Sequence, residues 1–154
     1  MTLDFTPALQ RIQSMIKGTG LFTAGVELFE PKSAPGKGIF CAIWLDEIGP
    51  VPQLSGQATT TGRVVFKARV MLPMLTQPED RIDQKMGSAV GAVMGLLSGD
   101  IELQDRVMFV DLLGHTGTPL SAKGGYVTIG TTMHRFMDVT VPLVISDVWN
   151  QGNP

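Results

Sequence analysis

Residues 63–72 constrain the fold more than any other part of the chain, because apolar residues occupy every second position. Side chains alternate between the two faces of a strand, so this period of two predicts a strand with one face in a core. The apolar face comprises Val64, Phe66, Ala68, Val70 and Leu72. The opposite face, open to solvent or to a partner, carries Arg63, Lys67 and Arg69 with Val65 and Met71.

A first amphipathic helix is predicted over Thr6–Lys17. Thr6 is suited to the N-cap position and Pro7 to the first helical position, and Gly18 is expected to end the helix. At 100° per residue the apolar side chains fall on one arc, so the helix has one buried side. The arc is formed by Phe5, Leu9, Ile12 and Ile16.

A second helix is predicted to begin at the capping box Thr76-Gln77-Pro78-Glu79 and to end at Ser98-Gly99-Asp100. Its apolar arc consists of Ile82, Met86, Val90, Val93 and Leu97. Beside that arc, glycines recur every fourth residue, and each costs about 0.8–1.0 kcal/mol relative to alanine. We expect close approach of another backbone to compensate, from the chain's own sheet or from a neighbouring subunit. These glycines are Gly87, Gly91 and Gly95.

Five further strands are predicted, and the long segments between them contain many Gly and Pro residues. The first covers residues 21–30 and is half-buried, and the second covers 39–48 and is expected to be central, with both faces covered. The third covers 106–113. The last two, 126–129 and 133–145, form a hairpin around Gly130-Thr131-Thr132. Pro142 removes a donor from the last strand and predicts an edge or a bulge there. The order helix, three strands, helix, three strands predicts one α+β domain over residues 1–154, with a mostly antiparallel sheet packed on two helices.

The charge content excludes some classes of function. Charged residues make up 17% of the 154 residues, below the usual roughly 25%, and the net charge is −2. Without a basic excess, nucleic-acid binding as the main function loses support.

The one cysteine, Cys41, lies in an apolar run and is expected to be buried and reduced. We expect neither a signal peptide nor a membrane span.

Catalytic and metal-binding signatures are weak in this sequence. The two histidines, His115 and His134, have no H-x-x-x-H spacing, and phosphate-binding or nucleophile-elbow motifs do not occur. We therefore expect no cofactor, no metal site and no enzymatic activity. The alternative, a small enzyme that uses His134 and Asp138 on one strand face, lacks a nucleophile.

One basic cluster remains as a candidate interface. Arg63, Lys67 and Arg69 share a strand face, and Lys32 and Lys37 lie in the loop at residues 31–38. Docking to an acidic partner is one interpretation. The other is a solvated sheet face, with Asp138 of a neighbouring strand paired to one of the cations. The loop at residues 49–60 is a second candidate contact, because long connections commonly bind a partner or move.

Few charges, nine methionines and long loops together favour a structural subunit whose surface other subunits cover. The sequence also resembles the tail terminator proteins of long-tailed, siphovirus-type bacteriophages, particularly those of actinobacterial phages. The resemblance covers nearly the whole chain and rests on the order of several segments. These are Phe29-Glu30-Pro31-Lys32-Ser33-Ala34-Pro35-Gly36, Ala42-Ile43-Trp44, Arg63-Val64-Val65-Phe66, Met74-Leu75-Thr76-Gln77-Pro78-Glu79-Asp80-Arg81-Ile82-Asp83, Ser98-Gly99-Asp100, Val110-Asp111-Leu112-Leu113-Gly114, Pro119-Leu120-Ser121-Ala122-Lys123-Gly124-Gly125-Tyr126 and Leu143-Val144-Ile145-Ser146-Asp147-Val148-Trp149.

The resemblance implies an α+β, non-enzymatic virion protein assembled in the host cytoplasm. It implies a homo-oligomer, a hexameric ring, that caps the tail tube protein at its head-proximal end and joins the head–tail connector or stopper protein. DNA would be only a passing cargo. A head-completion or stopper subunit is the alternative within this class of protein.

Overall fold

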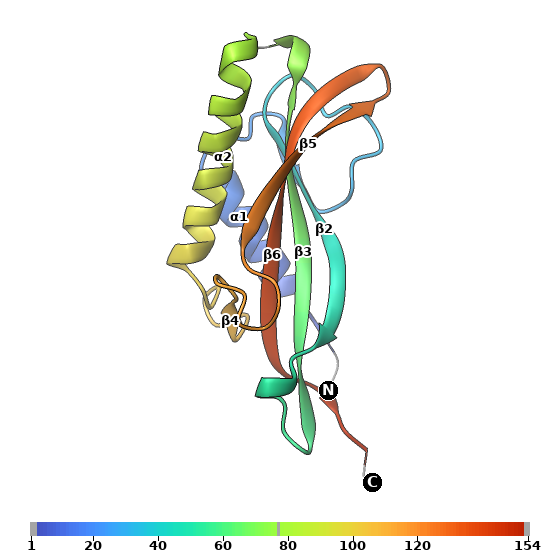
Figure 1. Cartoon of the computed structure of the whole chain (residues 1–154), viewed down its shortest axis with the longest axis vertical. Coiled ribbons are helices and arrows are strands. Elements are labelled where there is room, and N and C mark those ends of the chain that lie inside the picture. Colours follow the sequence, from blue (N-terminus) through green and yellow to red (C-terminus); the bar gives the residue numbers. More distant parts are fainter. Residues whose placement is uncertain (1–2, 77, 153–154) are drawn as a thin grey trace.

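The fold follows the predicted order of two helices and six strands (Figure 1). The structure is a computed structural model and describes residues 3–76 and 78–152. The helices are α1 (Thr6–Lys17) and α2 (Glu79–Gly99). The strands are β1 (Gly25–Glu27), β2 (Phe40–Pro50), β3 (Thr59–Pro73), β4 (Phe109–Val110), β5 (Ser121–Ile129) and β6 (Thr132–Asn150). Short 3-10 turns lie at Pro52–Leu54 and Met74–Thr76. The α+β class is therefore confirmed.

The six strands of the described residues form one mixed sheet in the order β1-β2-β3-β6-β4, with β5 also paired to β6. The β1–β2 pair is parallel, and all other pairs are antiparallel. Since β3 occupies one edge of β6, both β5 and β4 lie along its other edge. There β5 pairs with Thr132 to Thr140 and β4 with Leu143 and Val144.

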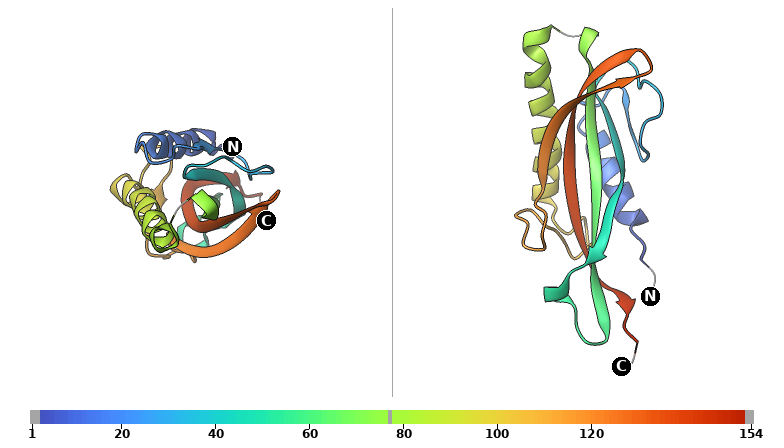
Figure 2. Two further views of the ribbon diagram at one scale, coloured as in Figure 1. Left: turned by 90° about the horizontal axis from the view of Figure 1, so that it is seen from above. Right: turned by 45° about the vertical axis from the view of Figure 1, so that its right-hand side comes forward.

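Both helices pack on the same face of the sheet, and the sheet curls away from them (Figure 2). The predicted apolar face of β3 lies in this core, and none of its side chains is more than 1% exposed. Burial of such aliphatic and aromatic side chains contributes about 1.5–3 kcal/mol each, which fixes the register of the strand. From the helix side, Ile12 and Met86 enter the same core, and the Phe5 ring stands edge-on to Phe66 at 5.2 Å.

The curled face holds a second, smaller apolar cluster. Phe40, Ala42 and Met71 are buried there against partly buried side chains, three of which belong to β5 and β6. The covering residues are Ala24, Trp44, Val127, Ile129 and Phe136. The β5–β6 hairpin turns at Gly130, as predicted, with Ile129 opposite Thr132 and a positive φ of 64° at the glycine. The hairpin therefore covers the upper part of a face that the sequence pattern had left open.

The prediction of a central strand at residues 39–48 is right for only part of β2. Residues 40–42 lie between β1 and β3, whereas from Ile43 to Pro50 the strand pairs with β3 alone. The exposure follows this change, because Leu45 to Ile48 are all exposed. The first part of β2 is therefore buried between two strands, whereas the part from Ile43 onward forms an edge of the sheet.

Two other predicted strands are shorter than expected. The segment 21–30 pairs only over Gly25–Glu27, and 106–113 pairs only over Phe109–Val110. A turn precedes β4 in which Leu103, Gln104 and Asp105 all have left-handed φ values of 48°, 54° and 64°. Each such residue costs roughly 1–2 kcal/mol. Burial of Leu103, which has no exposed surface, offsets part of this cost.

The edge or bulge predicted at Pro142 does not occur, because β6 has strands on both sides. Pro142 is paired with Val65 of β3, and its carbonyl accepts the N–H of Asp111 at 2.9 Å. The nitrogen of a strand residue points to the same side as its carbonyl. The missing donor of Pro142 therefore faces the gap between β5, which ends opposite Thr140, and β4, which begins opposite Leu143.

The N-cap positions of the two helices differ by one and two residues from the prediction. Thr6 is the first helical residue of α1, not its N-cap, and its N–H donates to the Asp4 carboxylate at 3.0 Å. For α2, Pro78 occupies the N-cap position, which has no side-chain cap hydrogen bond. The capping box also involves Gln77 and the Thr76 side chain, which lie outside the described residues. The predicted end of α2 is confirmed, with Asp100 as C-cap.

Candidate partner-binding surfaces

Arg63, a predicted partner contact, binds other parts of its own chain. Its Nη2 donates to Glu47 Oε1 at 2.6 Å and its Nη1 to the Thr116 carbonyl at 2.5 Å. Gly117 follows with a φ of 128°, and a Cβ at that position would collide with the guanidinium. Arg63 therefore joins the end of β2 to the loop after β4, and Nε is its one buried nitrogen without a hydrogen-bond partner in the described part of the chain.

Arg69 is also committed within the chain. Its Nε and Nη2 donate to the two carboxylate oxygens of Asp138 at 2.7 and 3.0 Å, and its side chain is 19% exposed. The guanidinium lies 4.0 Å from the Phe136 ring centre and 5.4 Å from that of Trp44. The hydrogen bond to Asp138 raises the pKa of Arg69, against the opposing effect of burial. The alternative in which Asp138 pairs with one of the cations is therefore confirmed.

We predict that Arg69→Lys lowers the free energy of unfolding by about 1–2 kcal/mol, because an ammonium cannot make the forked contact or stack on two rings. Urea denaturation of the purified chain measures the change. Lys67→Arg, on the same strand face and half-buried, serves as the matched control and should stay within about 0.5 kcal/mol of wild type. Equal losses in both variants would contradict this role for Arg69.

The five predicted cations do not form one cluster. Lys67 lies 3.9 Å from Asp46 and lines a hollow of about 290 Å³ with Lys123 and Thr140. Lys32 lines a separate hollow of about 300 Å³ beside Phe40, and Lys37 is exposed in the same loop. Phe40 pairs with Met71, eight residues along β3 from Arg63, which at 3.3 Å per residue is about 26 Å away.

The glycine stripe of α2, formed by Gly87, Gly91 and Gly95, faces open space. An added Cβ at any of the three positions would meet no atom within 4 Å. The compensation expected from the chain's own sheet is therefore absent. Every exposed residue from Met86 to Gly99 is Gly or Ser, and this stretch contains no charged residue. Contact with another subunit remains the predicted role of this stripe.

The sequence patterns did not single out Asp111, which organises the lower loops. Asp111 is 1% exposed, and its carboxylate accepts the N–H groups of Gly114, His115 and Thr116 and the Thr116 hydroxyl at 2.5–3.0 Å. Desolvation would raise the pKa of Asp111, but these four hydrogen bonds outweigh it and the pKa is lowered. This loop clamp holds the carbonyls that bind Arg63 and Gln53.

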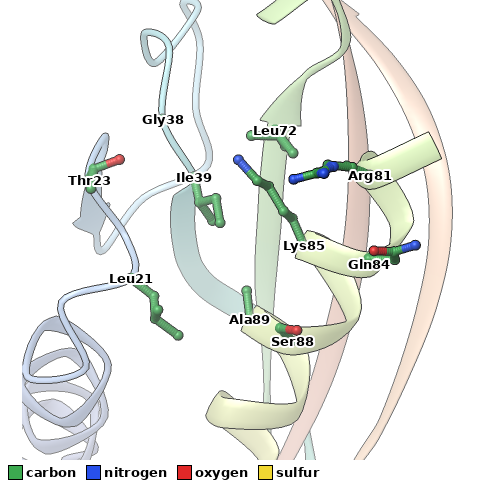
Figure 3. A pocket seen from close by; sticks show the side chains of 10 residues that line it. All are labelled: Leu21, Thr23, Gly38, Ile39, Leu72, Arg81, Gln84, Lys85, Ser88 and Ala89. Atoms are coloured by element: carbon green, nitrogen blue, oxygen red, sulfur yellow. The ribbon is translucent and has the colours of Figure 1, made fainter. Parts of the chain in front are cut away.

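A groove of about 520 Å³, also missed by the sequence analysis, lies between α2, the segments that precede β1 and β2, and the last residues of β3 (Figure 3). Its apolar walls are Leu21, Ile39, Leu72 and Ala89. Arg81 and Lys85 extend from α2 across its opening, beside Thr23, Gln84 and Ser88. The sequence patterns assigned no role to these two cations. The groove combines an aliphatic floor with positive charge and no lining carboxylate.

Two strongly exposed leucines lie far apart on the long axis of the molecule. Leu75, 91% exposed, sits in the turn between β3 and α2 at the top of Figure 1. Leu113, 79% exposed, lies in the loop that follows β4 in the lower half. Burial of either side chain by a partner would be favourable by about 1.5–3 kcal/mol.

The histidine of the enzyme alternative is not accessible. His134 has no exposed surface; its Nδ1 lies 3.2 Å from the Thr132 carbonyl, and its Nε2 has no partner in the described residues. Burial lowers the pKa of His134, against a smaller opposite effect of the Thr132 carbonyl. Across residues 3–76 and 78–152 there is no group of three or more metal-ligating side chains, and no helix is long and apolar enough to cross a membrane.

No protein-family model and no curated protein matches this chain. Among solved structures, it is similar to the sheath/tube terminator of an extracellular contractile injection system, PVC, in its extended state. The TM-score is 0.37 and the identity 16%, over 99% of this chain and 60% of the other. This chain thus spans about three fifths of that protein's length. A TM-score of this size does not establish a shared fold or function.

Proposed function

We propose that this chain is a structural subunit that forms a ring at the head-proximal end of a phage tail tube. The ring stops tube polymerisation and offers the surface to which the head connector binds. The observation that carries the proposal is the face of α2 from Met86 to Gly99, whose exposed residues are all Gly or Ser. Interface cores are depleted of charge in this way, and close approach of another chain would offset the cost of the three helical glycines.

Two exposed leucines at different heights on the long axis support contacts above and below such a ring. Leu75 projects from the turn at the top of Figure 1 and Leu113 from the loop after β4 in the lower half, and the loop clamp and Arg63 hold the lower loops in one arrangement. A subunit between a tube and a connector needs two separate contact surfaces. The resemblance of the sequence to tail terminators, set out above, supports the same role and favours six copies.

The deep burial of His134 and the pairing of Asp138 with Arg69 leave the enzyme alternative without an accessible base. The predicted cations divide accordingly. Arg63 and Arg69 act inside the subunit, whereas Lys32, Lys37 and Lys67 remain proposed partner contacts along with the glycine stripe.

Loss of the gene from a phage that encodes this chain is expected to give tails of uncontrolled length that fail to join heads. Without a terminator, tube subunits continue to add at the free end. Electron micrographs of lysates measure both features, and complementation with the wild-type gene is the control. Tails of normal length would reject the proposal. Pull-down with the tube subunit, compared with the portal-side connector, separates a terminator from a stopper.

A further inference from the structure

We propose that the groove beside α2 receives the segment Leu45-Asp46-Glu47-Ile48 of a second copy of this chain, so that successive copies join through two different surfaces. This inference rests on the ring proposed above and names one contact within it. Its test is chosen so that the ring can survive if the contact is wrong.

The groove has the chemistry to accept an acidic segment with aliphatic neighbours. Its volume of about 520 Å³ falls in the range of ordinary binding sites, roughly 300–1,000 Å³. Leu21, 42% exposed, and Ile39 form one wall, and Arg81 crosses the opening from α2 (Figure 3). The Arg81 guanidinium has no hydrogen bond or ion pair to any residue that the structure describes. An occupant that brings a carboxylate and a leucine or isoleucine side chain would satisfy both features.

The segment Leu45–Ile48 carries the complementary groups on the free lower edge of β2. The pairing of β2 with β3 shifts register between Leu45 and Glu47, so that Asp46 is an extra residue in a bulge. Bulges commonly turn a side chain away from the sheet. Within the segment Glu47 is paired with Arg63 at 2.6 Å, whereas the Asp46 side chain is 45% exposed and makes only a long ion pair, 3.9 Å from its Oδ1 to Lys67 Nζ. Leu45 and Ile48, on either side, are 40% and 44% exposed.

The segment cannot reach the groove of its own chain. It is held in β2 by antiparallel pairing with β3, seven residues beyond Ile39 at the groove wall, or about 23 Å along the strand. The contact must therefore join two copies, and it uses a different surface on each. Such heterologous contacts close into rings when the rotation between copies divides a full turn. This makes a second copy the occupant that the charge pattern favours.

Charge exchange tests the contact directly. Arg81→Glu alone and Asp46→Lys alone are each expected to weaken self-association about tenfold or more, because attraction is replaced by repulsion in a partly covered site. The double variant Arg81→Glu/Asp46→Lys should regain most of the lost association. Sedimentation velocity over a concentration series measures the oligomer, with negative-stain images to identify rings. Lys17→Glu and Glu102→Lys change the net charge equally at exposed sites outside the contact and should assemble as wild type does.

The outcomes separate the contact from the function. Rings that form normally in both single variants, or a double variant no better than either single one, would overturn the contact and leave the proposed function standing. A wild-type chain that never self-associates would overturn both. Since Asp46→Lys places two lysines side by side, thermal melts accompany each variant. Asp46→Asn with Arg81→Gln gives a milder pair, expected to weaken association without altering the melt.

Cysteine pairing provides a second readout that does not depend on ring stability. Ile48→Cys and Ser88→Cys are made in separate chains, mixed and oxidised. A disulfide-linked dimer is expected only in the mixture, because the contact joins position 48 of one copy to the groove of the other. The native Cys41 does not compete, since it is buried and desolvation raises its pKa to about 12. Equal dimer in either variant alone would contradict the proposed pairing.

Discussion

Asp111→Ala is expected to lower the free energy of unfolding by about 3–5 kcal/mol, a large share of the 5–15 kcal/mol typical of a domain. The substitution leaves three backbone N–H groups and the Thr116 hydroxyl without their acceptor. The loop clamp then opens, and Arg63 loses the Thr116 carbonyl. Urea denaturation measures the stability, and Asp111→Asn, which keeps one acceptor oxygen, should lose less.

The same site predicts a pH dependence. The pKa of Asp111 is lowered in the folded chain, so its contribution is fully present above the unfolded value of about 3.9 and is lost as the pH falls through the folded value. Wild type should therefore lose stability below about pH 4 more steeply than Asp111→Asn does. Glu102→Gln removes an exposed acid and should keep the wild-type slope. Parallel acid limbs in wild type and Asp111→Asn would contradict the assignment.

Replacing the three glycines of the stripe by alanine is expected to stabilise the free chain while it blocks assembly. Each exposed helical Gly→Ala change contributes about 0.8–1.0 kcal/mol, and no atom obstructs the new methyl groups. The triple variant should gain about 2–3 kcal/mol, roughly 5–10 °C in Tm for a chain of this size. In a ring, the same methyl groups would keep the neighbouring backbone away, so particles should carry unterminated tails.

Two measurements on the same protein, the thermal melt and the complementation of tail length, separate these effects. Ser14→Ala, an exposed change on α1, is the control for a stabilised helix outside the proposed interface, and it should complement fully. A triple variant that is more stable and still terminates tails would remove the glycine stripe from the interface. A triple variant that is less stable would contradict the open space around the stripe.

How far the sequence predicts the fold depends on how local each signal is. The core face of β3 and the span of α1 are confirmed because alternation and helical period are properties of neighbouring residues. The Gly130 hairpin is confirmed for the same reason, since a two-residue turn is read from its own residues. The predicted extents of β1 and β4 were wrong, because the length of a strand depends on a pairing strand that lies far away in the sequence.

The candidate interface shows the same division. Alternation placed Arg63 and Arg69 correctly on the face of β3 opposite the helices, but their partners, Thr116 and Asp138, lie 53 and 69 residues away in sequence. The sequence offered the pairing of Asp138 with one of the cations only as one of two interpretations, and it gave no sign of the contact between Arg63 and Thr116. The sequence also could not show whether the glycine stripe packs against the sheet or faces solvent, because the same spacing of glycines is compatible with both arrangements.

The sequence alone determined the class of the molecule: two amphipathic helices, alternating strands, and a surface short of charge. These properties follow from side-chain chemistry at fixed spacing. Only the tertiary structure decided which of the polar and glycine positions remain available to another chain. The physical reason is that availability depends on what the rest of the fold places within reach, as Asp138 does for Arg69, and as nothing does for Gly91.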